Sequence, residues 1–174
     1  MKTMTGLILA LFTTAVFSTP VVLTSAENKA VVQGVSEMAT AFRNQNYKVS
    51  VDKMPSQFFT HFKTNRGAML EVAKKSMAKL KELGFKVTAY THDKPANSYQ
   101  CKLSKVVFVP VKMIMTNGPK KLVSQSFLVV SQNENSKTWD IVDGAGARHR
   151  KLFDILYGCK GLAISMPPYS VKQM

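Results

Sequence analysis

Two long apolar segments joined by a turn constrain the fold more than any other part of this chain. Both lie within residues 98–143. In the first, residues 99–116, the odd-numbered positions are apolar except for Lys105, while the even-numbered positions are mixed. Alternation of this kind is typical of a β-strand with one buried face. Asn117-Gly118 follows, a pair that readily forms a tight hairpin turn. The apolar residues 122–130 are then predicted to return as the partner strand.

A third strand is predicted to complete an antiparallel meander. A polar turn at 132–137 leads to the short apolar segment Thr138-Trp139-Asp140-Ile141-Val142. A further alternating segment, residues 85–91, precedes the meander and is also predicted to be a strand. Because a sheet with one apolar face must be covered, helices are expected on that face.

Apolar residues spaced three and four positions apart predict these helices in the first half of the chain. The first covers residues 28–46. Residues 47–62 keep the same spacing, but Pro55 interrupts them, so two short helices are predicted, one on each side of it. A longer helix is predicted between Asn65, as the N-cap, and Gly84, as the residue that ends it.

The C-terminal part is predicted to hold one short helix and an extended segment. Residues 149–157 carry apolar residues at helical spacing, and Gly158 ends them. Residues 161–174 contain Pro167-Pro168 and are expected to lie across the body as a tail. Its expected contacts are Leu162, Ile164 and Met166. No repeat or linker divides residues 27–174, so we predict a single domain.

The N-terminus has the features of a signal peptide. Lys2 precedes an apolar run at 7–17, and Thr24-Ser25-Ala26 provides small residues before Glu27. The alternative is an uncleaved anchor, but its roughly 17 apolar residues are broken by Pro20. We therefore predict that residues 1–26 are removed, that the protein is periplasmic or secreted, and that the mature chain has no transmembrane anchor.

The mature chain contains two cysteines, Cys101 and Cys159. An even cysteine count in an exported protein suggests one disulfide, which would close a loop of about 58 residues and stabilise the fold by about 3–4 kcal/mol. Two separate buried thiols are the alternative. The sequence leaves the two possibilities open.

The charge is strongly basic, with 24 Lys and Arg against 10 Asp and Glu, a net charge of +14 at pH 7. Such a charge favours anionic partners, among them an anionic ligand or an acidic protein. The lysines are scattered, and Arg148-His149-Arg150-Lys151 is the one compact basic run. Because no aromatic stacking motif accompanies it, nothing favours nucleic acid as a partner.

Four features, in this order along the chain, resemble the nuclear transport factor 2-like superfamily, which includes SnoaL and the ketosteroid isomerases. They are the segment 47–62 with its central Pro55, Arg66-Gly67-Ala68-Met69-Leu70, Leu83-Gly84-Phe85-Lys86-Val87 and the segment NSKTWDIVDG at 135–144. In the last motif Asn135-Ser136 replaces the usual glycine. The resemblance covers residues 28–168 and is closest to small exported bacterial members of the superfamily.

The resemblance implies an α+β fold in which N-terminal helices pack inside a strongly curved antiparallel sheet, a cystatin-like or nuclear transport factor 2-like cone. It also implies a pocket between the helices and the sheet. Aromatic and flexible apolar residues on the predicted inward stripes are the candidates to line it, with ordinary core packing as the alternative. These candidates are Tyr47, Val51, Met54, Phe58, Phe62, Tyr99, Met113, Met115 and Trp139.

The sequence offers no complete catalytic set. A ketosteroid-isomerase-like site needs a carboxylate base in an apolar pocket, but Asp52 falls off the apolar stripe. His61, His92 and His149 lie in different segments without ligand spacing, so neither a metal site nor a cofactor is predicted. We therefore predict an exported, non-enzymatic binding protein for a small apolar or anionic molecule or a protein partner.

Two alternatives remain open. The first is an interaction protein that forms a homodimer through an exposed sheet face or neutralises an acidic toxin or enzyme. The second is a small isomerase or lyase that uses Asp52 and Tyr47.

Overall fold

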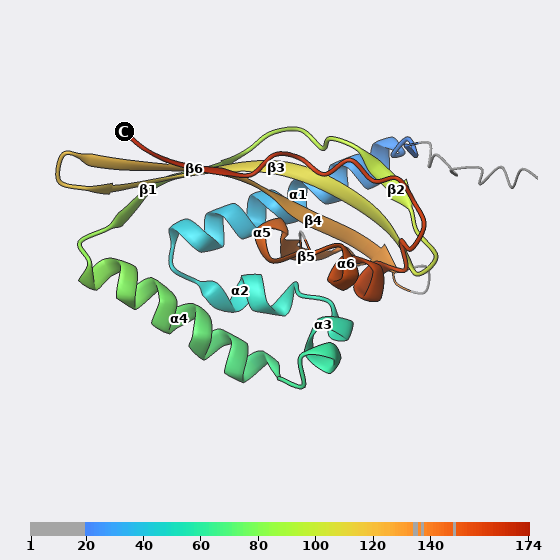
Figure 1. The fold of residues 1–174 in the computed structure, drawn as a ribbon, viewed down its shortest axis with the longest axis horizontal. Coiled ribbons are helices and arrows are strands. Elements are labelled where there is room, and N and C mark those ends of the chain that lie inside the picture. The colour runs from blue at the N-terminus through green and yellow to red at the C-terminus, as the bar shows by residue number, and fades with distance from the viewer. Residues whose placement is uncertain (1–19, 134–135, 137, 148) are drawn as a thin grey trace, which may run out of the picture.

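The computed structural model describes all residues except 1–19, 134, 135, 137 and 148. The fold is α+β: a curled antiparallel sheet of six strands forms a half-barrel, and helices pack against it (Figure 1). Most of the predicted signal peptide lies outside the described residues.

Four helices precede the sheet, close to where the apolar periodicity placed them. The break at Pro55 is confirmed, because this proline adopts an extended conformation and begins the third helix. Asn65 is confirmed as an N-cap, since its side chain accepts a hydrogen bond of 2.9 Å from the Ala68 amide. The four helices are α1 (Ser25–Arg43), α2 (Tyr47–Asp52), α3 (Ser56–His61) and α4 (Arg66–Glu82).

Helix α1 begins earlier than predicted. Thr24 and Glu27 form a capping box, in which each side chain accepts a hydrogen bond from the other residue's backbone amide. Just before it, the Val21 amide donates to the Ser98 carbonyl at 2.9 Å. The predicted cleavage point before Glu27 therefore lies inside the first turn of α1.

The sheet is built on one long hairpin. β3 (Ser104–Asn117) and β4 (Lys120–Asn133) pair along all 14 residues of each strand. The turn consists of Gly118-Pro119, one position later than predicted. Gly118 has φ 55°, and a glycine with positive φ followed by proline suits a type II′ turn. The other strands are β1 (Lys86–His92), β2 (Ser98–Gln100), β5 (Asp140–Asp143) and β6 (Ser170–Gln173).

The predicted first meander strand is two strands. The chain reverses at residues 101–103, where the Cys101 amide donates to the Ser104 carbonyl at 2.9 Å, so β2 pairs antiparallel with β3. A reversal changes which side chains share a face. Tyr99 and Cys101 consequently pack with Val106 and Phe108, and the prediction that they share a face with the odd-numbered residues of β3 is wrong.

Both faces of β3 are buried. Its residues 106–109 are at most 1% exposed. The odd-numbered side chains pack against α1 through Val31, Val35 and Met38. The even-numbered side chains form a second core with α6 (Arg150–Tyr157) and the tail. The face that the sequence left open for a partner is therefore covered at this end of the hairpin.

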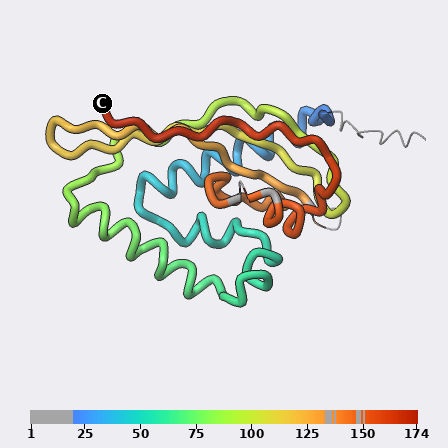
Figure 2. Tube along the Cα trace, in the orientation of Figure 1, coloured from blue at the N-terminus to red at the C-terminus, as the bar shows by residue number. Residues whose placement is uncertain are grey.

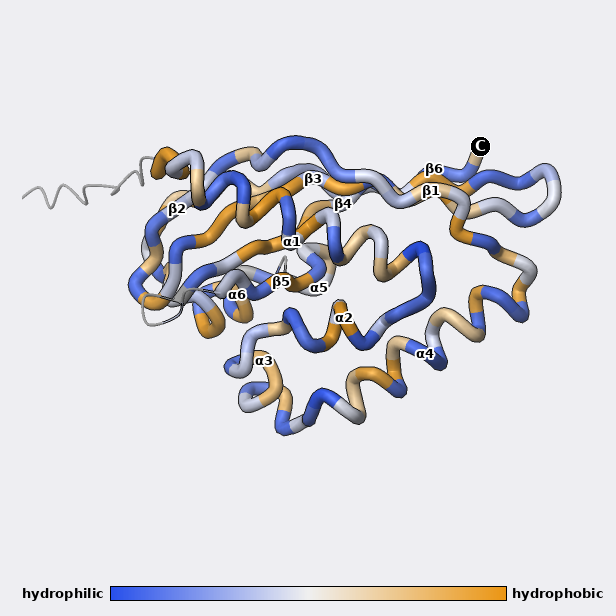
Figure 3. The backbone as a smooth tube through the Cα atoms, turned by 180° about the vertical axis from the view of Figure 1, so that it is seen from behind, coloured by the Kyte–Doolittle hydropathy of each residue, from blue (hydrophilic) through white to orange (hydrophobic). Residues whose placement is uncertain are grey.

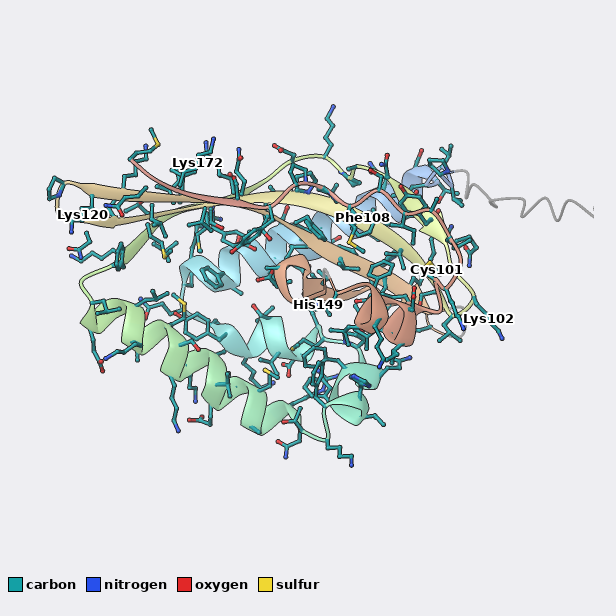
Figure 4. The ribbon with its side chains drawn as sticks, in the orientation of Figure 1. Cys101, Lys102, Phe108, Lys120, His149 and Lys172 are labelled. Carbon is teal, nitrogen blue, oxygen red and sulfur yellow. A yellow bond between two sulfur atoms is a disulfide. The ribbon has the colours of Figure 1, made fainter. Side chains whose placement is uncertain are left out.

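The C-terminal segment closes the second core. Residues 162, 164 and 166 contact it as predicted, and β6 then pairs with the edge of β4 (Figure 2). A disulfide joins Cys101 to Cys159, with 4.7 Å between their Cα atoms (Figure 4). Gly158, with φ 70°, lies where an added Cβ would come within 2.8 Å of Leu103. The close approach of these two loops therefore depends on a glycine.

A short helix, α5 (Gly144–Ala147), connects β5 to the segment before α6. A Cβ on Gly144 would lie 2.2 Å from the ring of Phe127 and 2.6 Å from its carbonyl oxygen. We expect Gly144→Ala to lower the free energy of unfolding by about 3 kcal/mol, because neither the buried ring nor the strand can move aside. Urea denaturation measures the change.

Gly146→Ala is the matched control, because nothing lies within 4 Å of a Cβ at that position. It should leave stability unchanged or raise it slightly. Equal stability of the two variants would contradict the assigned packing of α5 on β4.

The single polar residue on the odd-numbered face, Lys105, has a partner. Its ammonium group forms an ion pair with Glu27 at the start of α1, and both side chains are 21% exposed. The hydrogen bond from Lys105 is the main reason that the pKa of Glu27 is lowered from its ordinary value. The ionised carboxylate therefore favours the folded state.

Replacing Glu27 by Gln should reduce stability in a pH-dependent way. A lowered folded-state pKa contributes stability above the unfolded pKa, and this is lost as the pH falls through the folded value. We expect the wild type to exceed E27Q by about 1 kcal/mol at about pH 7 and by progressively less as the pH falls below about 4, measured by urea denaturation. Glu71→Gln, in the exposed pair with Lys74, is the control and should change little. Identical pH profiles for E27Q and the wild type would refute this account.

Candidate ligand groove beneath helix α4

Helix α4 is the one long helix that does not enter either core. None of its 17 residues is fully buried, although Met69, Val72, Met77 and Leu80 form an apolar stripe along it. Val72 remains 56% exposed. Figure 1 shows α4 running along the far side of α2, away from the sheet. Met69, Met77 and Leu80 are half-buried, so α2, which packs against α4, covers the stripe only in part. An apolar stripe with incomplete cover is the feature that needs a functional explanation.

The N-terminal end of α4 is fixed to the two short helices. The Arg66 guanidinium donates hydrogen bonds to the carbonyls of Val51, Asp52 and Met54, the last at 3.1 Å. It also lies 4.6 Å from the centre of the Phe59 ring. Arg66 thus binds the last carbonyls of α2, which have no partner within that helix.

The C-terminal end of α4 is fixed to the hairpin. The Asn117 side chain donates a hydrogen bond of 2.8 Å to the Leu83 carbonyl. Gly84 follows with φ 80°, and an added Cβ there would lie 3.0 Å from the Asn117 side-chain oxygen. The helix is therefore fixed at both ends, and between them a space remains under its C-terminal half.

This space is a groove of about 610 Å³ between α4, the end of α1 and β1. The volume lies within the range of roughly 300–1,000 Å³ that is typical of small-molecule sites. Figure 3 shows hydrophobic residues along α4 and at the start of β1, interspersed with hydrophilic ones. The apolar lining consists of Phe42, Met77, Ala78, Leu80, Phe85, Val87 and Met115.

The polar part of the lining carries positive charge and no carboxylate. It consists of Tyr47, Gln45, Gly84, Arg43, Lys74, Lys81 and Lys86. Burial raises the pKa of Tyr47, so its phenol remains a neutral hydrogen-bond donor. The ring of Tyr47 packs edge-on against Phe42, with 5.9 Å between the centroids. The groove can therefore hold an apolar body and donate hydrogen bonds at its mouth.

Of the nine residues predicted to line a pocket, the structure brings two to this groove, Tyr47 and Met115. Met113 and Trp139 pack against the first core, and Tyr99 is buried in the second. The remaining four belong to the short helices: Val51 is buried, Met54 half-buried, Phe58 packed against the second core, and Phe62 47% exposed.

Most residues of the groove wall were not among those predicted from the sequence to line a pocket. Helical periodicity places Met77 and Leu80 on the apolar side of the predicted helix, but it does not identify what covers that side. Phe85 lies between α4 and β1, and Val87 lies in β1. A helix–strand junction with apolar residues on both sides was therefore the sequence signal that could have identified them.

Apart from Tyr47, the residues considered for catalysis or metal binding lie outside the groove. Asp52 is exposed and forms an ion pair with Lys48. His92 contacts the Ser36 hydroxyl at 2.9 Å. In the described part of the chain no three His, Cys, Asp or Glu side chains lie close enough together to hold a metal ion. The groove lining itself contains no carboxylate, histidine or cysteine.

A second polar region lies between β5 and α6, outside the groove. Burial raises the pKa of Asp140, and Tyr157, 1% exposed in the second core, has its pKa raised mainly by burial as well. Neither residue lines the groove. Both groups are therefore held in their neutral forms more strongly than in water, as expected for polar side chains inside a core.

Comparison of the chain with protein-family models, curated proteins and solved structures finds no match in any of the three. Among the helices within the described residues, none combines the length and the apolar character that a membrane span requires.

We expect Arg66→Ala to loosen α4 while leaving both cores intact, because Arg66 fixes the N-terminal end of that helix. Amide hydrogen exchange in residues 66–82 should become about 10-fold faster, and exchange in β3 and β4 should not change. Lys75→Ala, an exposed change on the same helix, is the control. Unchanged protection of α4 in R66A would show that the arginine does not hold it.

Proposed function

We propose that this protein is an exported, non-enzymatic binding protein that holds an apolar small molecule in the groove beneath α4. The observation that carries the proposal is a long helix fixed at both ends, with its apolar stripe only partly buried above a groove of about 610 Å³. Binding an apolar molecule there would remove both the stripe and the groove lining from water.

The groove composition supports binding rather than proton transfer. General acid–base chemistry at neutral pH needs a group with a pKa near that pH, most often histidine or a buried carboxylate. The lining offers a phenol, one side-chain amide and four cationic side chains. Methionines 77 and 115 add flexible apolar surface that adapts to ligands of different shape.

The signal-like N-terminus and the disulfide support export. Residues 1–26 have the composition of a signal peptide. The Cys101–Cys159 disulfide fits the same proposal, because disulfides persist in oxidising compartments. A half-barrel sheet with α1 packed against one face also supports membership of the nuclear transport factor 2-like superfamily, as its motifs suggested.

Binding of a neutral, fluorescent apolar probe, N-phenyl-1-naphthylamine, tests the proposal without involving charge. We expect saturable binding to the wild type. Met77→Glu should weaken it at least about 10-fold, because a carboxylate in the groove wall must be desolvated when the probe binds.

Ser76→Glu is the matched control, since Ser76 is exposed, adjacent in sequence and outside the groove lining. It adds the same charge to α4 and should leave probe affinity within about twofold of the wild type. Absence of saturable binding to the wild type, or equal loss in M77E and S76E, would overturn the proposal.

A further inference from the structure

The mouth of the α4 groove is surrounded by cations from three separate elements. Arg43 ends α1, Lys74 and Lys81 lie on α4, and Lys86 begins β1. No carboxylate belongs to the same lining. The charged side chains around this apolar groove are therefore four cations and no anion, so the local potential is positive.

Three of these cations have no carboxylate partner among the described residues. Lys74 forms an ion pair of 2.9 Å with Glu71, its neighbour on α4. Arg43 donates to the Thr40 hydroxyl at 3.1 Å, a neutral acceptor. Neither Lys81 nor Lys86 has an ion pair within the described part of the chain. What sets the groove apart is therefore the grouping of these cations around one apolar lining that contains no carboxylate.

The charge extends over the same end of the molecule. The C-terminal end of α4, the start of β1 and the tip of the β3–β4 hairpin lie together at one end (Figure 1). Lys120 lies at the hairpin tip and Lys172 on β6 beside it (Figure 4). The field of these side chains adds to that of the mouth and attracts anions towards it.

We propose that the ligand is a single-chain amphiphile whose anionic head, a carboxylate or a phosphate, binds among Arg43, Lys81 and Lys86 while its hydrocarbon tail lies along the apolar wall. The inference rests on the proposed function and names the ligand class. The tail is placed against Met77, Leu80 and Phe85, whose burial provides most of the affinity.

The head is recognised by charge-assisted hydrogen bonds. Arginine can bind a carboxylate or a phosphate through two parallel N–H groups, and lysine adds point charges. Tyr47 lies in the same lining and can donate one more hydrogen bond to an oxygen of the head. A neutral head would leave the cations without a counterion, and a cationic head would be repelled.

Displacement of N-phenyl-1-naphthylamine by a series of amphiphiles below their critical micelle concentrations tests the inference. The series is palmitate, hexadecanol, hexadecyltrimethylammonium, lysophosphatidate and lysophosphatidylcholine. We expect palmitate or lysophosphatidate to displace the probe at a concentration at least about 10-fold lower than hexadecanol, and the cationic amphiphile to be the weakest. The better of the two anions identifies the source of the head as a fatty acid or a phospholipid.

The triple variant Arg43→Gln, Lys81→Gln, Lys86→Gln should lose the preference for anions, so that palmitate and hexadecanol displace the probe at similar concentrations. The triple variant Lys102→Gln, Lys151→Gln, Lys160→Gln removes the same charge from exposed positions outside the groove and should keep that preference. Both variants have the same net charge, so the comparison separates a local site from the overall field.

The outcomes separate the inference from the proposed function. If the probe binds but palmitate, lysophosphatidate and hexadecanol displace it equally, the anionic head is refuted and the apolar groove stands. If both triple variants lose the preference equally, general positive charge explains it and the inference falls. If the probe does not bind the wild type at all, the proposed function itself fails.

Discussion

Burial of strand β3 on both faces is the constraint on which the rest of the structure depends. Val107 and Val109 pack against α1, while Val106 and Phe108 pack against α6, and all four are at most 1% exposed. A strand buried in this way needs a cover on each side, so the N-terminal helix and the C-terminal segment are both required. The disulfide between Cys101 and Cys159 and the β6–β4 pairing hold the second cover in place.

The two cores use the helices and segments that lie closest to β3, and α4 is left outside them. Arg66 fixes one end of α4 to α2, and Asn117 fixes its other end to the hairpin. The Asn117 contact lies next to the Gly118-Pro119 turn, so the position of α4 depends on the register of the hairpin. The groove is thus a consequence of how the long helix is attached to a core that is already complete.

The charged residues at the two ends of α1 have different surroundings. At its start, the one charged residue of the inward face, Lys105, is neutralised by Glu27, so the charge serves the fold. At its end, Arg43 contributes to a mouth with no carboxylate in its lining. A group of cations around an apolar lining without a carboxylate is what the proposed anion-binding site requires.

The sequence by itself determined the types of α1–α4, β1 and α6, the break at Pro55, the cap at Asn65 and the existence of the β3–β4 hairpin, because periodicity and turn residues act locally. Only the tertiary structure decided that the chain reverses at 101–103, which places Tyr99 in the second core, and that α6 and the tail cover the second face. It also decided that the stripe of α4 is only partly buried and that Tyr47 and Met115 both line the groove beneath it. These outcomes depend on which apolar surfaces find partners in space, and an apolar periodicity looks the same whether its partner is a core or an open groove.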